Sequence, residues 1–157
     1  MDTTKGRMVS FASALDFRDL TPAVIHAIKQ RFIDTMGCAL GAFSTEPAVI
    51  TRRIAANVQS TFNAGILGTR IKSSPELAAF TNGAMIRCLD FNDDYFGKDG
   101  PHPSDTIAAV LAAADATHAN GKALITGIAV AYEILCTLVD VVSLRDKGWD
   151  YITYTAP

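Results

Sequence analysis

The chain has 157 residues, of which 49% are hydrophobic and 19% are charged, and its net charge is −2. This balance is typical of a folded globular protein and excludes a disordered chain. The sequence contains no basic patch, which argues against nucleic acid as a partner. Residues 1–13 lack the apolar core of a signal peptide, so we expect a cytoplasmic protein.

Helical periodicity covers most of the chain. Thr21 and Pro22 form a helix start, with a capping hydroxyl followed by proline at the first helical position. A second helix is predicted over residues 48–59. The apolar stripe expected on the first helix consists of Val24, Ile25, Ile28, Phe32, Ile33, Met36 and Leu40. The inward residues expected on the second are Ile50, Ile54, Ala55 and Val58.

Residues 60–72 break the helical pattern, because Gly65 and Gly68 bracket a short apolar run. We expect a small β-hairpin or an irregular arm there. Ser74, Pro75 and Glu76 then start another helix, which is predicted to end near Phe91. The inward positions expected on it are Leu77, Phe80, Ala84 and Leu89.

Two further helices are predicted. One begins at residues 103–105 and stops near Asn120. The other covers residues 122–144 and is apolar on nearly all sides, which is typical of a buried central helix. It is long enough to span a membrane, but Glu133 and Asp140 would be costly in lipid, so we expect no membrane partner. The predicted fold is therefore all-α, one helical bundle domain over residues 1–157.

The polar segment 83–105 is the candidate functional region. Four residues with oxygen-bearing side chains lie close together within it, and a glycine-containing loop follows them. His102 then stands between two prolines, ahead of Ser104 and Asp105. Such a segment between apolar helices is poor core material and is suited to proton transfer. The four clustered residues are Asp90, Asn92, Asp93 and Asp94.

Simpler interpretations of the same residues stay open. His102 can serve only as a polar residue that caps the following helix, and Asp93 and Asp94 can be ordinary surface carboxylates. The cluster offers oxygen ligands for a hard cation, but it lacks the middle glycine and the final glutamate of an EF-hand, so we expect no metal. Cys38, Cys88 and Cys136 are widely spaced, which favours free thiols over a zinc or iron–sulfur site.

Four stretches resemble the N-terminal part of the MmgE/PrpD family, which includes 2-methylcitrate dehydratase and cis-aconitate decarboxylase. They are RFIDTMGCALGAF, LAAFTNGAMIRCLDFNDDY, GPHPSD and GKALITGIAVAYEI. Their order and spacing both agree with the family pattern over about residues 9–155. The resemblance implies a helical domain from a longer enzyme, usually a homodimer, which needs no metal and no organic cofactor.

The resemblance also implies site residues. Asp90 of the LDF motif and His102 of the HPS motif match positions that line the family's active site. Asp93 is expected to share the catalytic role, and Asp94 and Ser104 are expected to contact the substrate. The lysines that bind substrate carboxylates in the family come after Pro157.

The function predicted first is therefore a cofactor-independent lyase acting on small di- or tricarboxylic acids, similar to 2-methylcitrate dehydratase. It would abstract a proton next to a carboxylate, with His102 as acid or base. The alternative is a non-catalytic fragment of a truncated or split gene, or a helical association module, which needs the missing C-terminal half. The absent lysines and a C-terminus without a closing element favour the alternative.

Overall fold

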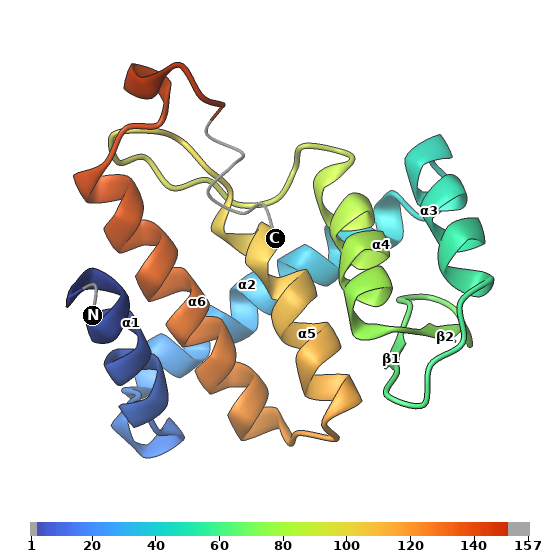
Figure 1. Ribbon diagram of the computed structural model, residues 1–157, viewed down its shortest axis with the longest axis horizontal. Helices are drawn as coiled ribbons and strands as arrows, with labels where there is room; N and C mark the ends of the chain where they lie inside the picture. The colour runs from blue at the N-terminus through green and yellow to red at the C-terminus, as the bar shows by residue number, and fades with distance from the viewer. Residues whose placement is uncertain (1–2, 151–157) are drawn as a thin grey trace.

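The computed structural model describes residues 3–150 (Figure 1). Within that range lie six α-helices, three short 3₁₀ helices and one two-stranded hairpin, which confirms the all-α prediction. The predicted domain over 1–157 also includes residues 1, 2 and 151–157, and these lie outside the described residues. The elements are α1 (Thr3–Ala14), η1 (Phe17–Asp19), α2 (Pro22–Gly41), α3 (Glu46–Ala56), β1 (Ala64–Gly65), β2 (Lys72–Ser73), α4 (Pro75–Arg87), η2 (Pro103–Thr106), α5 (Ile107–Ala116), α6 (Gly121–Val141) and η3 (Arg145–Lys147).

Helix α4 is the centre of the packing, because it contacts α2, α3 and α5. Its Met85 and Ile86 are fully buried. The residues packed around them are mostly alanines from α2, α3 and α5, and such small side chains let helix backbones approach closely. The buried cluster consists of Ala39, Ala42, Ala48, Ala55, Ile66, Met85, Ile86 and Ala108.

The hairpin predicted over 60–72 is confirmed. Its two strands pair antiparallel, with Ala64 opposite Ser73, and Gly68 supplies a positive φ of 73° in the turn. Asn82 of α4 joins this arm to the bundle: its Oδ1 accepts from the Leu67 N–H at 3.0 Å, and its Nδ2 donates to the Gly65 carbonyl at 3.1 Å.

Several predicted inward faces are wrong. On α3, Ile50 and Ile54 are 47% and 48% exposed. Ala55 is buried as predicted, and Ala48, which was not predicted to face inward, is buried as well. The physical reason is that close helix contacts select small residues, which leaves larger neighbours at the edge. Exposure is also high for Val24, Ile33, Leu40, Val58 and Phe80.

Helix α6 differs from its prediction as a buried central helix. It contacts α1, α2 and α5, and only 17% of its most apolar 18-residue window is buried. Ile128, Leu135 and Val139 form its buried line. By length and composition α6 qualifies as a membrane-spanning helix, as core helices of soluble proteins also do, so the absence of a membrane partner stays a prediction.

Element boundaries also shift. Helix α4 ends at Arg87 rather than near Phe91, because Asp90 adopts a left-handed φ of 56° that a helix cannot continue through. The fourth predicted helix begins as the 3₁₀ turn η2, and its α-helical part ends at Ala116. Asn120 begins α6 rather than ending α5, since its Oδ1 accepts the N–H groups of Lys122 and Ala123. Helix α1 was not predicted.

Candidate functional site

A long loop, residues 88–102, carries the candidate site from the end of α4 to η2. It crosses the top of the view in Figure 1 and reaches the C-terminal end of α6. There the Lys98 N–H donates to the Val139 carbonyl at 3.0 Å, and the Tyr95 hydroxyl donates to the Asp140 carboxylate at 3.0 Å. Gly97 allows this contact, because a Cβ on it would lie 2.8 Å from Asp140 Oδ1.

Asp99 ties the same loop to the segment that follows α6. Its buried carboxylate accepts the Leu144 N–H at 2.7 Å and the Ser143 hydroxyl at 3.3 Å. The loop is therefore fixed at its far end by backbone and side-chain bonds, and its two arms are held in place beside each other.

His102 lies at the end of the returning arm and is only 7% exposed. Its Nδ1 is 2.8 Å from the backbone carbonyl oxygen of Asp93 and 3.0 Å from Asp94 Oδ1. Because a carbonyl oxygen can only accept, Nδ1 carries the proton. In the neutral ring, Nε2 therefore keeps its lone pair, and this atom lies 3.5 Å from Asp90 Oδ1.

Asp90 and Asp94 approach the two ring nitrogens from the solvent side. Their side chains are 67% and 46% exposed. Asp90 also forms an ion pair with Arg87, one turn earlier in the chain. The left-handed φ of Asp90 is a strained conformation for a residue with a side chain, and it directs the carboxylate back toward Arg87 and His102. Asp90 and His102, which the resemblance assigns to one active site, thus lie within 3.5 Å of each other.

Asp93 is arranged differently from its neighbours, because its carboxylate points away from the imidazole into the protein. Oδ1 accepts the Ser104 N–H at 2.9 Å, and Oδ2 accepts the Tyr132 hydroxyl at 2.8 Å. Arg31 Nε is 3.9 Å from Oδ2. Asp93 was predicted as catalytic, and the structure places only its backbone carbonyl on His102. Its carboxylate joins the loop to η2, α2 and α6.

Ser104, predicted to bind substrate, is enclosed. It is 1% exposed, and its Oγ accepts from Asn92 Nδ2 at 2.9 Å. The same Nδ2 donates to Asp105 Oδ1 at 2.8 Å, while Asn92 Oδ1 is buried with no hydrogen-bond partner among the described residues. Burial raises the pKa of the Asp105 carboxyl, and the nearby Arg87 charge opposes this. The start of the short helix η2 is not available to an anion, because the Ser104 N–H already donates to the Asp93 carboxylate.

The arrangement presents a proton acceptor beside open carboxylates. His102 makes no side-chain capping bond to η2, so the interpretation as a helix cap does not describe its contacts. An imidazole whose Nδ1–H is held by a carbonyl is a defined base at Nε2, and Asp90 can stabilise the charge that protonation creates. Across residues 3–150, no group of three His, Cys, Asp or Glu side chains could hold a metal ion.

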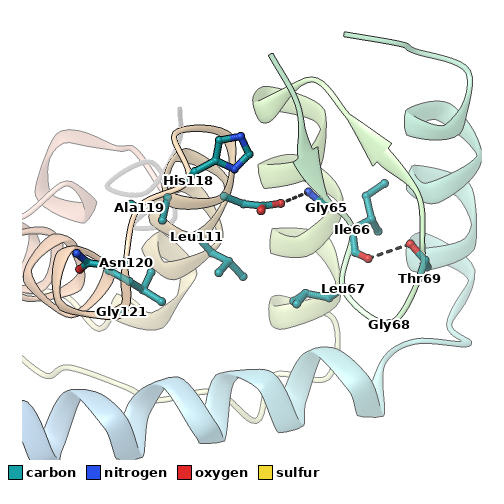
Figure 2. Close-up of a pocket in the computed structure, with 13 residues that line it drawn as sticks. Gly65, Ile66, Leu67, Gly68, Thr69, Leu111, His118, Ala119, Asn120 and Gly121 are labelled. Atoms are coloured by element: carbon teal, nitrogen blue, oxygen red, sulfur yellow. Dashed lines mark hydrogen bonds between the residues drawn. The ribbon is translucent and has the colours of Figure 1, made fainter. Parts of the chain in front are cut away.

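The pocket drawn in Figure 2 lies elsewhere, between the hairpin and the turn that joins α5 to α6. Its volume is about 520 Å³, and Thr69, Asp115 and His118 are among the residues that line it. Asp115 is already engaged, since its Oδ2 accepts the Gly65 N–H at 2.6 Å. This pocket is not lined by Asp90, Asp94 or His102. Its volume is therefore no reason to place the candidate active site there.

Sequence reasoning missed the contribution of Tyr132 and Arg87. Tyr132 lies on apolar α6, where a buried hydroxyl needs a partner, and that requirement was the available signal. Burial and the neighbouring Asp93 charge both raise the pKa of Tyr132 above its ordinary value. Arg87 stands one turn before Asp90, a spacing that places the two side chains on the same face of a turn.

Comparison with known proteins identifies the family of this chain. The family model described as the MmgE/PrpD N-terminal domain matches residues 6–157. The 2-methylcitrate dehydratase of Cupriavidus necator is 35% identical over 133 residues, which cover 76% of this chain and 27% of that protein. Its counterpart in Salmonella typhimurium is 37% identical over the same shares.

The mitochondrial 2-methylcitrate dehydratase of Yarrowia lipolytica is 30% identical over 149 residues, which cover 87% of this chain and 29% of that protein. The chain thus spans between a quarter and a third of the length of these relatives. The matched range includes every candidate site residue named above. The chain belongs to the MmgE/PrpD family, and residues 6–157 correspond to its N-terminal domain.

Proposed function

We propose that this domain serves a cofactor-independent lyase that dehydrates small di- or tricarboxylic acids. Relatives named 2-methylcitrate dehydratase support the dehydration of such an acid. The observation that carries the proposal is the imidazole of His102, whose Nδ1–H faces the Asp93 carbonyl at 2.8 Å. This contact leaves Nε2 as the proton acceptor, next to the open carboxylate of Asp90. The predicted roles of Asp90 and His102 remain proposals.

The reaction would begin at Nε2. Its lone pair takes the proton from the substrate carbon next to a carboxylate, and the electron pair left on that carbon forms the new C=C bond. The hydroxyl on the adjacent carbon leaves with the proton that the His102 imidazolium gives back, so that water is released and the neutral imidazole is restored. Asp90 would stabilise the imidazolium formed in the first step, from a distance of 3.5 Å.

Substrate binding would need positive charge, because Asp90 and Asp94 repel a carboxylate. Arg87 offsets part of this repulsion through its pairing with Asp90, and Arg31 is 57% exposed on the other side of Asp93. The family resemblance assigns further carboxylate-binding lysines to sequence outside this chain. We therefore propose that Asp94 contacts a substrate hydroxyl rather than a carboxylate, and that Ser104 acts through Asn92.

Turnover of 2-methylcitrate, and separately of citrate, tests the proposal when wild-type protein is compared with His102→Ala. We expect loss of the olefinic product in the variant, with roughly 100-fold or larger effect for removal of a general base. His118→Ala is the matched control, because His118 is exposed on another part of the molecule. Equal rates for wild type and His102→Ala would reject the proposed function.

The alternative, an association module without catalysis, makes a different prediction in the same samples. A chain that binds 2-methylcitrate equally well before and after His102→Ala, and never converts it, supports the alternative. We further propose a cytoplasmic protein that forms a homodimer. Val141 at the end of α6 is 60% exposed, which leaves apolar surface for a partner. Sedimentation as a stable monomer at micromolar concentration would contradict the dimer.

A further inference from the structure

We propose that Tyr132 of α6 is a positioning residue for His102, acting through Asp93 to hold the imidazole in the form protonated at Nδ1. The inference rests on the proposed function, since it concerns how the base of that reaction is oriented. Tyr132 does not touch the ring. It contacts the carboxylate of the residue whose backbone carbonyl accepts the ring N–H.

The Asp93 side chain is fixed from two directions by donors. The Ser104 N–H approaches Oδ1 at 2.9 Å from η2, and the Tyr132 O–H approaches Oδ2 at 2.8 Å from α6. The Asp93 side chain is 7% exposed, so water is a poor substitute for either donor. A turn of the Asp93 backbone, which would move its carbonyl away from His102, would also pull the carboxylate off these two donors, so the two bonds resist that movement.

Tyr132 is suited to this role at any pH at which the protein would work. Burial is the main reason that its pKa is raised, and the Asp93 charge adds to the effect. The hydroxyl therefore stays protonated and can donate without interruption. Hydrogen bonds of a neutral hydroxyl to a carboxylate are among the stronger ones in proteins.

The groups on the two sides of the His102 ring decide which of its nitrogens carries the proton. With the Asp93 carbonyl in place, Nδ1–H is satisfied and Nε2 keeps its lone pair. If that carbonyl turns away, Nδ1–H keeps the half-exposed Asp94 carboxylate at 3.0 Å as its acceptor, in competition with water. The proton can then also move to Nε2 and donate to Asp90 Oδ1, which lies 3.5 Å from Nε2. Nε2 would then already carry a proton and could not accept one from the substrate, even with every side chain of the site in place.

Nitrogen NMR of histidine-labelled protein tests this inference without requiring turnover. The chain has three histidines, so the exposed His26 and His118 provide references beside His102. For the neutral ring, we expect the wild-type His102 nitrogens to report the Nδ1–H form, because Nδ1 faces the Asp93 carbonyl. Tyr132→Phe, which removes one oxygen atom, should shift them toward the Nε2–H form.

Tyr95→Phe is the matched control. It removes the same kind of bond between the same loop and the same helix, but its partner is Asp140 and not Asp93. We expect the His102 nitrogens to stay unchanged in this variant. Asp93→Asn is a second test, because a carboxamide has one acceptor oxygen and cannot serve both donors; it should shift His102 in the same direction as Tyr132→Phe.

The outcomes separate this inference from the proposed function. Unchanged His102 nitrogens in folded Tyr132→Phe, or an equal shift in Tyr95→Phe, would overturn the positioning role. Where Tyr132→Phe does not fold, Asp93→Asn decides by the same criterion. Loss of turnover in His102→Ala together with unchanged nitrogens in Tyr132→Phe would keep the lyase and reject the inference. In an active sample, Tyr132→Phe should lower kcat with KM unchanged.

Discussion

Asp93 and Asp94 are consecutive in the sequence and yet face opposite environments. The Asp93 side chain is 7% exposed and accepts bonds from Ser104 and Tyr132, whereas the Asp94 side chain is 46% exposed and lies 3.0 Å from Nδ1 of His102. The difference shows that neighbouring carboxylates can have two different roles. The Asp93 carboxylate holds the loop in place, and the Asp94 carboxylate remains accessible to a ligand.

The largest effect expected from this comparison is on stability. Asp93→Ala leaves the Tyr132 hydroxyl and the Ser104 N–H buried without acceptors, and each unsatisfied group costs about 1–3 kcal/mol. We expect the free energy of unfolding in urea to fall by about 3 kcal/mol. Asp94→Ala should change it by less than about 0.5 kcal/mol, because the Asp94 carboxylate is itself 46% exposed and such ion pairs contribute little. Equal losses in both variants would contradict the division of roles.

The far end of the loop provides the next test. In Gly97→Ala the new methyl would lie 2.8 Å from Asp140 Oδ1 and 2.9 Å from Val139 Cγ1, so the loop must move off α6. We expect a loss of about 1–3 kcal/mol, typical of overpacking. Gly100→Ala is the matched control, because its Cβ would meet the Phe96 ring at an ordinary 3.6 Å. Thermal unfolding of both variants measures the difference.

Asp90 gives a smaller and more specific prediction, because its φ of 56° suits glycine. Asp90→Gly and Asp90→Ala both remove the ion pair with Arg87, so that comparing them isolates the backbone strain. We expect the glycine variant to be more stable by about 1 kcal/mol, the cost of a left-handed conformation for alanine. At Asp94, where the structure records no positive φ, alanine should be the more stable of the two. Urea unfolding of the four variants distinguishes these outcomes.

The sequence predicted the parts of this fold that depend on local signals. Thr21 and Pro22 mark the start of α2, and the hairpin within 60–72 follows from Gly65 and Gly68. Inward faces were harder to predict, because an alanine surface leaves little periodic signal: Ala48 is buried while Ile50 and Ile54 are not.

The candidate site was predictable to a similar degree. The family motifs assigned Asp90 and His102 to one active site, and the structure brings their side chains within 3.5 Å, but the sequence left Asp93 as an equal candidate for the partner of His102. The inward turn of Asp93 did not follow, because it depends on Tyr132, which is 39 residues away in sequence and comes close only when α6 packs beside the loop. A long-range bond between two common residue types leaves no pattern in a single chain.

The smallest expected effect concerns Cys136, a half-buried thiol on the same helix as Tyr132. The pKa of Cys136 is raised to about 11, mainly by burial of the thiol and next by the negative charge of Asp140. Since only the thiolate reacts, the reactive fraction at pH 8 is about one in a thousand, and it rises about tenfold per pH unit up to pH 10. Iodoacetamide labelling followed by mass spectrometry of the peptide measures this slope, with free cysteine as the reference. Asp140→Asn should lower the pKa and speed labelling at pH 8; labelling as fast as free cysteine in the wild-type protein would show that Cys136 is not shielded by α6 and its neighbours.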